Sequence, residues 1–584
     1  MTTSNICILI SIVAYLFLVL IIGVVCARQN NSVDDFYLGG RKLGPLVTAM
    51  SAEASDMSSW LLMGLPGVAY LSGASEAVWT ALGLAIGTYF NWLIVSKRLR
   101  NYSQKIDAIT IPEFFSKRFG EKNKVIMAIS AVVIIVFFVP YTASGFAACG
   151  KLFSTVFGLE YHLAMVLSAL VIVGYTTIGG FLAASTTDFM QSIIMTVALI
   201  VILGFGTYSA GGFENVIANA QSLPGYFSLT ESFDAATKTS TPFSLLSIFS
   251  LLAWGLGYFG MPHILLRFMA IGDSKQLKLS RRVATVWVVI SLAIAVFIGF
   301  VGLAMTNNGT LEHLADSETI IVSIANLISK NGIVFALLAG VILAGILAST
   351  MSTADSQLLA ASSGVSENIV GGLFKVKTSK KSAMIIARVT LLVISVVAVI
   401  LAWDPNSSVF QIVSFAWAGF GAAFGPVVLC ALFWKRANKY GAFSGMFVGG
   451  AMVFVWKYLI APIGASNPEL SFLNIYELLP AFLAGLIVII VVSLLTKKPS
   501  QDIVDTFEEV KKMNWFIVSK LSQFCHIVIY CIEHYSKDTT VFVANQMKNH
   551  RKVFQLEKLI DKHLPEKELL NEIKSWKTIF NHHI

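Results

Sequence analysis

The sequence predicts an all-α integral membrane protein with about 13 transmembrane helices, and three observations support this. Of the 584 residues, 56% are hydrophobic and only 13% are charged, whereas soluble domains carry about 25% charged residues. Apolar runs long enough to cross a bilayer recur along the chain. Two of these runs contain Gly, Pro and polar residues near their middle, which is typical of the binding site of a secondary transporter.

Thirteen apolar segments are expected to span the membrane, in chain order. The first, residues 6–27, is too long for the core of a signal peptide and has no basic leader, so we expect a retained helix. The centres of the segments fall near residues 17, 58, 86, 137, 173, 199, 256, 294, 342, 393, 421, 450 and 485.

Lys and Arg residues indicate the orientation of these segments. They are concentrated after the third, seventh, ninth and eleventh spans, whereas the alternate loops at 71–77, 212–242, 306–318 and 404–409 carry almost none. Because positive loops stay in the cytoplasm, the N-terminus is expected outside and the C-terminus inside a plasma membrane. The net charge of +9 is then explained by anionic lipid headgroups and gives no reason to expect nucleic-acid binding.

The two interrupted spans are the second and the seventh, so five spans separate their starts. Two halves of five spans each, at about 43–211 and 243–434, would have opposite orientations, as in transporters with inverted repeats. The transmembrane domain is expected over residues 1–498. Residues 499–584 have mixed charge and are expected to form a cytoplasmic helical tail of unknown role, in which Trp515–Ile532 predicts an amphipathic helix.

The first interrupted span carries groups that suit a sodium ion. It reads S-A-E-A-S-D-M-S-S-W-L-L-M-G-L-P-G from Ser51. Ala54 and Met57 lie where helical hydrogen bonding is expected to fail, which would free their carbonyl oxygens. Asp56 is a carboxylate within an apolar segment and is therefore a candidate functional residue. The alternative is a kinked helix in which Asp56 caps the inner half.

The ninth span offers further oxygen ligands. Hydroxyl side chains recur from Ala348 to Asp355, among them Ser349, Ser352 and Thr353. Such hydroxyls can simply bond back to carbonyls of their own helix. Together with the first interrupted span, they predict a cage of hydroxyl and carbonyl oxygens for a hard cation.

The second interrupted span predicts a pocket for a small amphipathic solute. Trp254, Tyr258 and Pro262 recur every four residues, so an α-helix would place them on one face. Gly255, Gly257 and Gly260 beside them allow the backbone to come close to a ligand. Ordinary helix packing is the alternative.

Other chemistries find little support in the sequence. The six cysteines are scattered and form neither a metal motif nor a disulfide framework. Gly145 to Lys151 fits the opening of a phosphate-binding loop, but Leu152 replaces the magnesium-binding hydroxyl residue. No acid–base or nucleophile arrangement is evident, so we expect neither an enzyme nor a cofactor.

Four phrases resemble the sodium/solute symporter family, and most closely its proline-carrying members, over roughly residues 5–500. They are Asp34–Arg41 (D-D-F-Y-L-G-G-R), the phrase from Ser51, W-G-L-G-Y-F-G-M-P-H-I-L-L-R-F-M-A from Trp254, and F-A-W-A-G-F-G-A-A-F-G-P-V-V-L from Phe415. The resemblance implies a LeuT-like core of two inverted five-helix repeats. It also implies sodium-coupled uptake of proline by alternating access, in a bacterial inner membrane.

The resemblance implies roles for individual residues, which we expect at the following positions. Sodium would bind Ala54, Met57, Ser349, Ser352 and Thr353; proline would contact Trp60, Gly64, Tyr141, Trp254, Tyr258 and Pro262; coupling and gating would involve Asp56, Ser58, Arg41 and Asp188.

The chain departs from the family pattern at Glu53, where a small residue is usual, and at Met261, which replaces Gln. Glu53 predicts either a changed ion affinity with added proton dependence, or a carboxylate paired elsewhere in the bundle. Met261 leaves open a different small solute as the substrate. A transporter-like sensor with a signalling tail is a more distant alternative, and the sequence does not indicate the oligomeric state.

Overall fold

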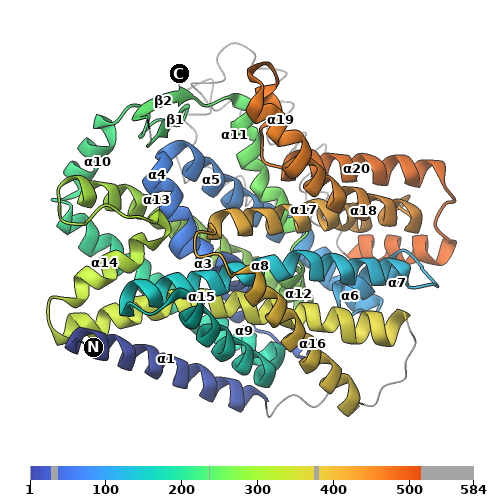
Figure 1. Ribbon diagram of the computed structural model, residues 1–584. Coiled ribbons are helices and arrows are strands. Elements are labelled where there is room, and N and C mark those ends of the chain that lie inside the picture. Colours follow the sequence, from blue (N-terminus) through green and yellow to red (C-terminus); the bar gives the residue numbers. More distant parts are fainter. Residues whose placement is uncertain (1, 28–36, 236, 374–379, 514–584) are drawn as a thin grey trace, which may run out of the picture. The chain divides into compact units, whose positions relative to one another are not determined.

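The computed structural model describes residues 2–27, 37–235, 237–373 and 380–513 (Figure 1). The chain divides into two compact units, residues 1–510 and 511–584, and the first unit is described below. The tail helix expected at Trp515–Ile532 lies outside the described residues, as do Asp34, Asp35 and Phe36 of the first matching phrase.

Nearly all elements of the first unit are helices. The first half of the chain forms α1 (Thr3–Ala27), η1 (Gly39–Arg41), α3 (Pro45–Ser59), η2 (Trp60–Gly64), α4 (Leu65–Ser72), α5 (Ala74–Phe90), η3 (Asn91–Val95), α6 (Ser96–Lys105), α7 (Ile111–Arg118), α8 (Val125–Phe157), α9 (Tyr161–Ser209) and α10 (Phe213–Ser222). A short antiparallel hairpin follows, formed by β1 (Glu231–Asp234) and β2 (Thr239–Pro242).

The second half continues in the same way. It forms α11 (Leu245–Leu252), η4 (Ala253–Phe259), α12 (Pro262–Ala270), η5 (Ser274–Gln276), α13 (Leu277–Asn307), η6 (Ser317–Thr319), α14 (Ile320–Ser329), α15 (Ile333–Ser363), η7 (Gly364–Leu373), α16 (Lys380–Leu401), α17 (Val409–Phe433), α18 (Lys439–Val455), η8 (Trp456–Ile460), α19 (Ala461–Ser466), η9 (Pro468–Leu473) and α20 (Leu478–Leu495).

All thirteen expected span centres fall inside these helices. Nine helices of the described residues are long and apolar enough to cross a membrane, and ten if the bent pair Leu245–Phe259 and Pro262–Ala270 is one span. Of the other three segments, the one near residue 58 is interrupted, and those near 173 and 393 lie in the shorter apolar helices Tyr161–Thr177 and Arg388–Leu401. The structure therefore supports a multi-pass membrane protein.

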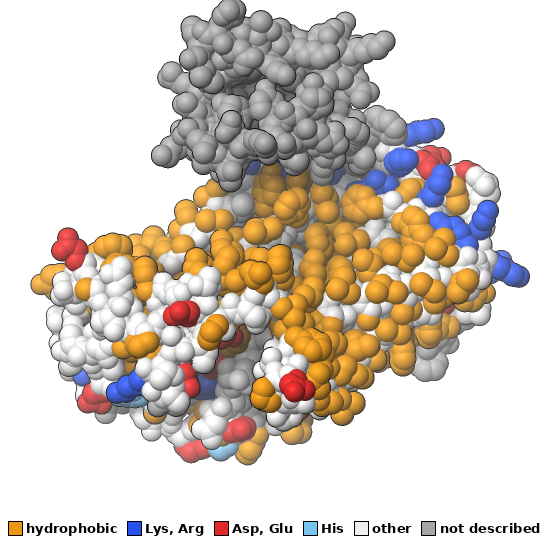
Figure 2. All heavy atoms as spheres, turned by 90° about the horizontal axis from the view of Figure 1, so that it is seen from above, with side chains coloured by type: hydrophobic (Ala, Val, Ile, Leu, Met, Phe, Trp, Pro, Cys, Tyr) orange, Lys and Arg blue, Asp and Glu red, His pale blue; other side chains and the backbone are white. Residues whose placement is uncertain are grey.

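The surface of the unit suits a bilayer. Large apolar side chains are exposed along the outer helices, such as Phe17 on α1, Leu170 on α9 and Ile487 on α20. Figure 2 shows hydrophobic side chains covering much of this face, with Lys and Arg gathered at the end where α7 lies in Figure 1. Lipid can solvate the apolar band, so these exposed side chains need no protein partner.

Some of the basic residues assigned to loops are in fact buried, which corrects the sequence-based picture. Arg98 on α6 and Arg118 on α7 are 5% and 1% exposed, and both guanidinium groups lie 5.0 Å from the ring centroid of Phe507. Arg267, expected in a loop after the seventh span, is 1% exposed on α12. Periodicity and charge cannot show that such residues form packed helices.

Three helices are interrupted where the sequence has small residues. α3 loses helical geometry at Ser58 (φ 35°, ψ −170°), and the wider turn η2 follows directly. α9 breaks at Gly180 (φ 71°, ψ −177°), a conformation that glycine adopts without steric cost. η4 is a 3₁₀ segment that bends by 45° into α12. Both interruptions predicted from the sequence are therefore confirmed.

α15 is the helix against which the interrupted first span packs. It contacts α1, α3, α8 and α9, and every residue from Ile342 to Ser363 on it is buried. α5 approaches η4 so closely that a Cβ on Gly87 would lie 2.3 Å from the Cα of Gly255. Glycine on both sides allows this contact, as is common where membrane helices meet.

This close contact predicts that Gly87→Ala destabilises the protein. The added methyl group has only backbone beside it, and overpacking of this kind costs about 1–3 kcal/mol. Thermal unfolding of the purified protein in detergent measures the effect. Gly174→Ala on α9 is the matched control, since no heavy atom lies within 4 Å of its added Cβ. Equal melting temperatures for the two variants would contradict the observed contact.

Candidate functional site

The break in α3 creates the centre of the candidate site. Trp60 N–H donates to the Met57 carbonyl and also to Ser58 Oγ at 3.1 Å, so the backbone turns tightly after Met57. Ser58 has a positive φ that a non-glycine residue rarely adopts, and such strain persists only where the surrounding structure enforces it. Strained backbone of this kind is concentrated at ligand sites.

One hydrogen bond joins the two helices expected to hold sodium. Ser352 Oγ on α15 donates to the Ala54 carbonyl on α3 at 2.8 Å, and both residues are fully buried. Thr353 Oγ1 donates to the Ser349 carbonyl, while Ser349 Oγ donates to the Ile346 carbonyl, both within α15. The structure thus brings Ala54 and Ser352 together directly, and the other hydroxyls bond back to their own helix.

Asp56 connects α3 to the second interrupted segment. Its Oδ2 accepts a hydrogen bond from the Tyr258 hydroxyl at 2.7 Å, and its backbone carbonyl accepts one from the Tyr141 hydroxyl at 3.0 Å. Its carboxylate makes no hydrogen bond to Ser352 or Thr353. Asp56 therefore faces η4, whereas the Ala54 carbonyl faces α15.

An aromatic cluster lies beside the break. The ring centroids of Trp60 and Trp254 are 5.6 Å apart, and Phe410 lies 6.0 Å from Trp60 and 5.6 Å from Trp254. A Cβ on Gly64 would approach Phe410 to 3.3 Å, so the small residue keeps the backbone close to this cluster. Two of the expected substrate residues therefore share one apolar surface with Phe410 of α17.

The geometry of η4 differs from the α-helix assumed for this stretch. In a 3₁₀ segment, residues four apart point about 120° away from each other. Trp254 faces the aromatic cluster, while Tyr258 faces Asp56, and Pro262 begins α12. The expectation that all three share one α-helical face is therefore wrong, although Trp417 contacts both Trp254 and Tyr258.

Trp417 of α17 holds this 3₁₀ segment in place. Its indole N–H donates to the Trp254 carbonyl at 2.8 Å and so joins α17 to η4. A Cβ on Gly257 would lie 2.0 Å from the same indole nitrogen, so only glycine fits there. A small cavity nearby is lined by Ser58, Tyr141 and Thr353, among others, and thus adjoins both candidate sites.

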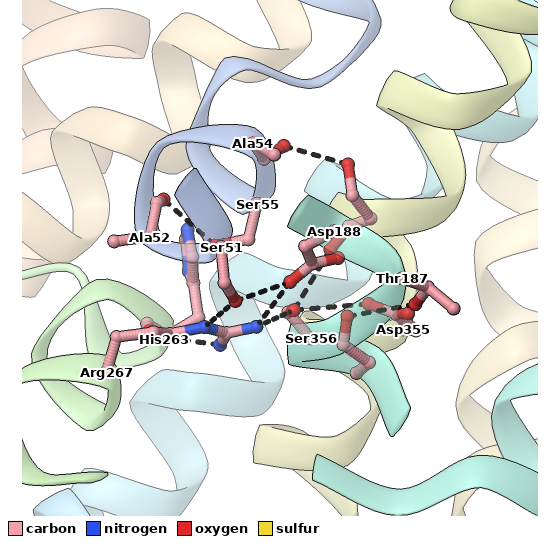
Figure 3. Close-up of polar contacts among 12 residues, drawn as sticks. Ser51, Ala52, Ala54, Ser55, Thr187, Asp188, His263, Arg267, Asp355 and Ser356 are labelled. Carbon is pink, nitrogen blue, oxygen red and sulfur yellow. Dashed lines mark hydrogen bonds and ion pairs between the residues drawn. The ribbon is translucent and has the colours of Figure 1, made fainter. Parts of the chain in front are cut away.

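A buried charge network lies next to the sodium candidates (Figure 3). Arg267 Nη2 on α12 lies 3.1 Å from Asp188 Oδ2 on α9, and both residues are at most 1% exposed. Ser51 Oγ lies between them, donating to Asp188 and accepting from Arg267 Nε. Arg267 also donates to Ser356 Oγ, which donates to Asp355 Oδ1. Asp188 is therefore coupled to α3, α12 and α15.

Arg41 lies in a different place from the other candidates. Its guanidinium donates to the carbonyls of Met269, Ser103 and Ala108 and to Ser103 Oγ. These bonds connect η1 to α6, α12 and the segment after α6. None of them reaches a sodium or substrate candidate.

Several residues of the site were not predicted from the sequence. Arg267 is a charge within an apolar run, a signal that could have marked it. Trp417 lies within a phrase already identified, but its contact with Trp254 spans 163 positions. The sequence marked Lys151 only by a weak match to a phosphate-binding loop. In the structure, Lys151 forms ion pairs of 2.8 and 2.7 Å with Asp316 and Glu318.

Comparison with known proteins identifies the family. The family model described as "Sodium:solute symporter family" matches residues 36–449. The chain belongs to the sodium:solute symporter family. It is therefore a membrane transporter and not an enzyme.

Similar proteins from three bacteria carry closely related names. The "High-affinity proline transporter PutP" of Bacillus subtilis is 42% identical over 84% of this chain and 98% of its own length. The "Sodium/proline symporter" of Haemophilus influenzae is 43% identical over 86% of this chain and 97% of its own length. The "Sodium/proline symporter" of Staphylococcus aureus is 40% identical over 84% and 93%, respectively.

Solved structures share the fold. A sodium-coupled sialic acid symporter in a substrate-bound outward-open state superposes with a TM-score of 0.68 at 18% identity, covering 85% of this chain and 99% of its own. The nucleobase-cation-symport-1 family transporter Mhp1, in a closed conformation, gives a TM-score of 0.50 at 14% identity over 81% and 98%, respectively. At these identities the likeness concerns the fold alone, which is that of the LeuT-like transporters.

The buried network predicts that Arg267→Met destabilises the fold. The variant leaves Asp188 buried without its cation, which costs about 3–5 kcal/mol, whereas Arg267→Met/Asp188→Leu removes both charges and regains much of that stability. The thermal unfolding midpoint in detergent is the measurement.

Lys105→Met is the control, because the exposed Lys105–Glu509 pair contributes less than about 1 kcal/mol. A melting temperature for Arg267→Met equal to that of the control would show that the buried pair does not stabilise the fold.

Proposed function

We propose that this chain takes up L-proline by coupling its entry to the entry of sodium, through alternating access. The single observation that best supports this function is the hydrogen bond from Ser352 to the Ala54 carbonyl, which joins α15 to α3 beside the aromatic cluster. The names of the similar proteins support the choice of both solutes.

Sodium would bind at this junction. A dehydrated sodium ion needs several oxygen ligands, and we assign them to the Ala54 and Met57 carbonyls and to Ser349, Ser352 and Thr353. In the observed structure, the Ser352 and Thr353 hydroxyls bond to carbonyls within this set. Such hydroxyls can rotate toward an ion while keeping the backbone in place.

Proline would bind against the aromatic cluster. Its ring is small and apolar, which suits the indoles of Trp60 and Trp254, while Gly64 leaves room beside them. The polar end of the site is formed by Tyr141, Ser58, Tyr258 and Asp56, the last of which is bonded to Tyr258 at 2.7 Å. Pro262 would limit the pocket at the start of α12.

Coupling follows from the position of α3 between the two sites. A sodium ion between α3 and α15 would fix the turn at Ser58, and the same turn positions Trp60. Neither solute then binds well alone, which is the condition for coupled transport. Each sodium ion that enters brings about 2.3 kcal/mol per 100 mV of membrane potential. Asp188 and Arg41 would act on the inward path.

The finer architecture is part of the same proposal. We assign thirteen spans, two inverted five-helix halves at about 43–211 and 243–434, an external N-terminus and a cytoplasmic C-terminus in a bacterial plasma membrane. The paired interruptions in α3 and η4, each near the start of its half, support this arrangement. Basic residues at one end of the unit agree with the orientation.

A different small solute is the second candidate, and Met261 is the observation that favours it. Met261 is fully buried at the start of α12, next to Pro262, and replaces a polar residue of the family pattern. Competition between labelled proline and unlabelled amino acids distinguishes the two substrates.

The proposal predicts sodium-driven proline accumulation by the purified full-length protein in vesicles. An inward sodium gradient should drive labelled proline above its external concentration, because the gradient is the only energy source present. Replacing external sodium with potassium should abolish accumulation. Equal uptake in both salts would reject the proposal.

The sodium site predicts the behaviour of Ser352→Ala. Removal of one oxygen ligand and one buried hydrogen bond of about 1 kcal/mol should raise the sodium concentration for half-maximal uptake by roughly 5- to 10-fold. Ser362→Ala, which removes a hydroxyl bonded to Leu359 of the same helix, is the control. An unchanged sodium requirement for Ser352→Ala would show that Ser352 is not a sodium ligand.

A further inference from the structure

The first compact unit ends with the helical residues 501–510, which pack on one end of the bundle. Asp502 and Asp505 of this segment are exposed, whereas Phe507 and Val510 are 3% and 0% exposed. Residues three apart lie on one side of a helix, so Phe507 and Val510 form an apolar contact face. The segment is therefore docked on the bundle, although its other side is polar.

Phe507 lies against two buried arginines. The Cζ atoms of Arg98 on α6 and Arg118 on α7 are each 5.0 Å from the centroid of its ring, and these two residues are 5% and 1% exposed. In the described part of the chain, neither guanidinium group forms an ion pair with a carboxylate. A buried cation is costly without a partner, and the face of an aromatic ring attracts a cation. Phe507 therefore stabilises both arginines in their buried positions.

The same two arginines contact the end of α17. Arg98 Cζ also lies 5.0 Å from the ring centroid of Phe433, the last residue of α17. Arg118 Nε donates to the Ala431 carbonyl of α17 at 2.7 Å. Phe507 thus completes a contact that joins α6, α7 and the end of α17.

α6 is also bonded to the second interrupted segment. Arg100 on α6 donates from Nε to the Ile271 carbonyl at 2.7 Å and from Nη2 to the Gly272 carbonyl at 3.2 Å, directly after α12. Residues 501–510 instead follow α20, which packs on α17 and α18. Alternating access shifts one group of helices against another around the site. The contact at Phe507 therefore joins parts of the bundle that such a shift would separate.

A cavity lies at the other end of α7. It is lined by Thr110, directly before α7, by Arg267 and Ser356 of the buried network, and by Ser363 at the end of α15, among others. Under the proposed orientation, the end at which α7 lies is cytoplasmic (Figure 2). A shift of α7 away from α17 would widen this cavity toward the buried network.

We propose that residues 501–510 form a clamp that keeps the cytoplasmic path closed and has to release α6 and α7 before proline and sodium can leave. This inference rests on the proposed function. While Phe507 is docked, α6 and α7 stay against α17 and the cavity at the start of α7 stays narrow. When the clamp opens, α6 and the end of α12 can shift together, because Arg100 bonds them.

The first test is a disulfide that holds the clamp shut. A Cβ on Gly120, two residues after α7, would lie 3.0 Å from Ile503 Cγ1. It would therefore lie at most about 4.5 Å from Ile503 Cβ, within the range of a disulfide. Gly120→Cys/Ile503→Cys is made in the full-length protein together with Cys525→Ser and Cys531→Ser, because the four cysteines of the described residues are buried.

Oxidation of this variant should abolish sodium-driven proline uptake in vesicles, and dithiothreitol should restore it. Sodium-dependent proline binding in detergent should be unchanged, because the clamp blocks release and not binding. Each single-cysteine variant, treated with the same oxidant, should keep its uptake. Uptake retained by the disulfide-bonded protein would overturn the clamp, and so would the loss of binding together with uptake.

A second variant tests the docked ring without a cross-link. Phe507→Leu keeps an apolar side chain but removes the ring face, so the clamp should open more often. Ser363→Cys, added in the same cysteine background, reports the opening through its rate of labelling by a membrane-impermeant maleimide in inside-out vesicles. Phe507→Leu should raise this rate roughly 5-fold, the effect of one lost cation–π contact.

Phe17→Leu on α1 is the matched control, because Phe17 is 64% exposed and lies outside the clamp. Equal labelling rates for Phe507→Leu and this control would overturn the clamp and leave sodium-coupled uptake standing. Proline uptake by the wild type that ignores sodium would instead reject the proposed function, while the labelling rates would still report whether Phe507 holds this side closed.

Discussion

Most of the site depends on one constraint, the loss of helical geometry at Ser58 inside the protein. Backbone groups freed there cannot reach water and must find partners within the bundle. The Ala54 carbonyl accepts a hydrogen bond from the Ser352 hydroxyl, and the Asp56 carbonyl accepts one from the Tyr141 hydroxyl. Trp60 N–H donates to the Met57 carbonyl and to Ser58 Oγ. These partners come from α8 and α15 as well as from α3 itself. The turn therefore fixes where several helices meet.

The three buried carboxylates around this turn have different surroundings. Asp188 is paired with Arg267 and accepts a hydrogen bond from Ser51. Among the described residues, Asp56 has a phenolic donor and Glu53 an indole donor, and neither forms an ion pair with a Lys or Arg. Carboxylates with donors and no counter-charge are suited to a mobile cation.

The sequence was sufficient for the class of fold and for the two interruptions, because Gly, Pro and Asp within apolar runs have a direct physical meaning in a membrane. It was insufficient where a partner lies far along the chain. Arg267 and Asp188 are 79 positions apart, and Ser352 and Ala54 are 298 apart, so no local pattern joins them. The four-residue spacing of Trp254 and Tyr258 also led to the wrong prediction of a shared helical face, because the segment is a 3₁₀ helix and not an α-helix.

If the turn at Ser58 links an ion site to a solute site, sodium must strengthen proline binding even when no transport occurs. Equilibrium calorimetry on the purified protein in detergent measures this directly, with sodium or with potassium at equal ionic strength. The linkage predicts that sodium lowers the dissociation constant of proline by roughly 5- to 150-fold, the usual range for coupled sites. Equal dissociation constants in the two salts would contradict it.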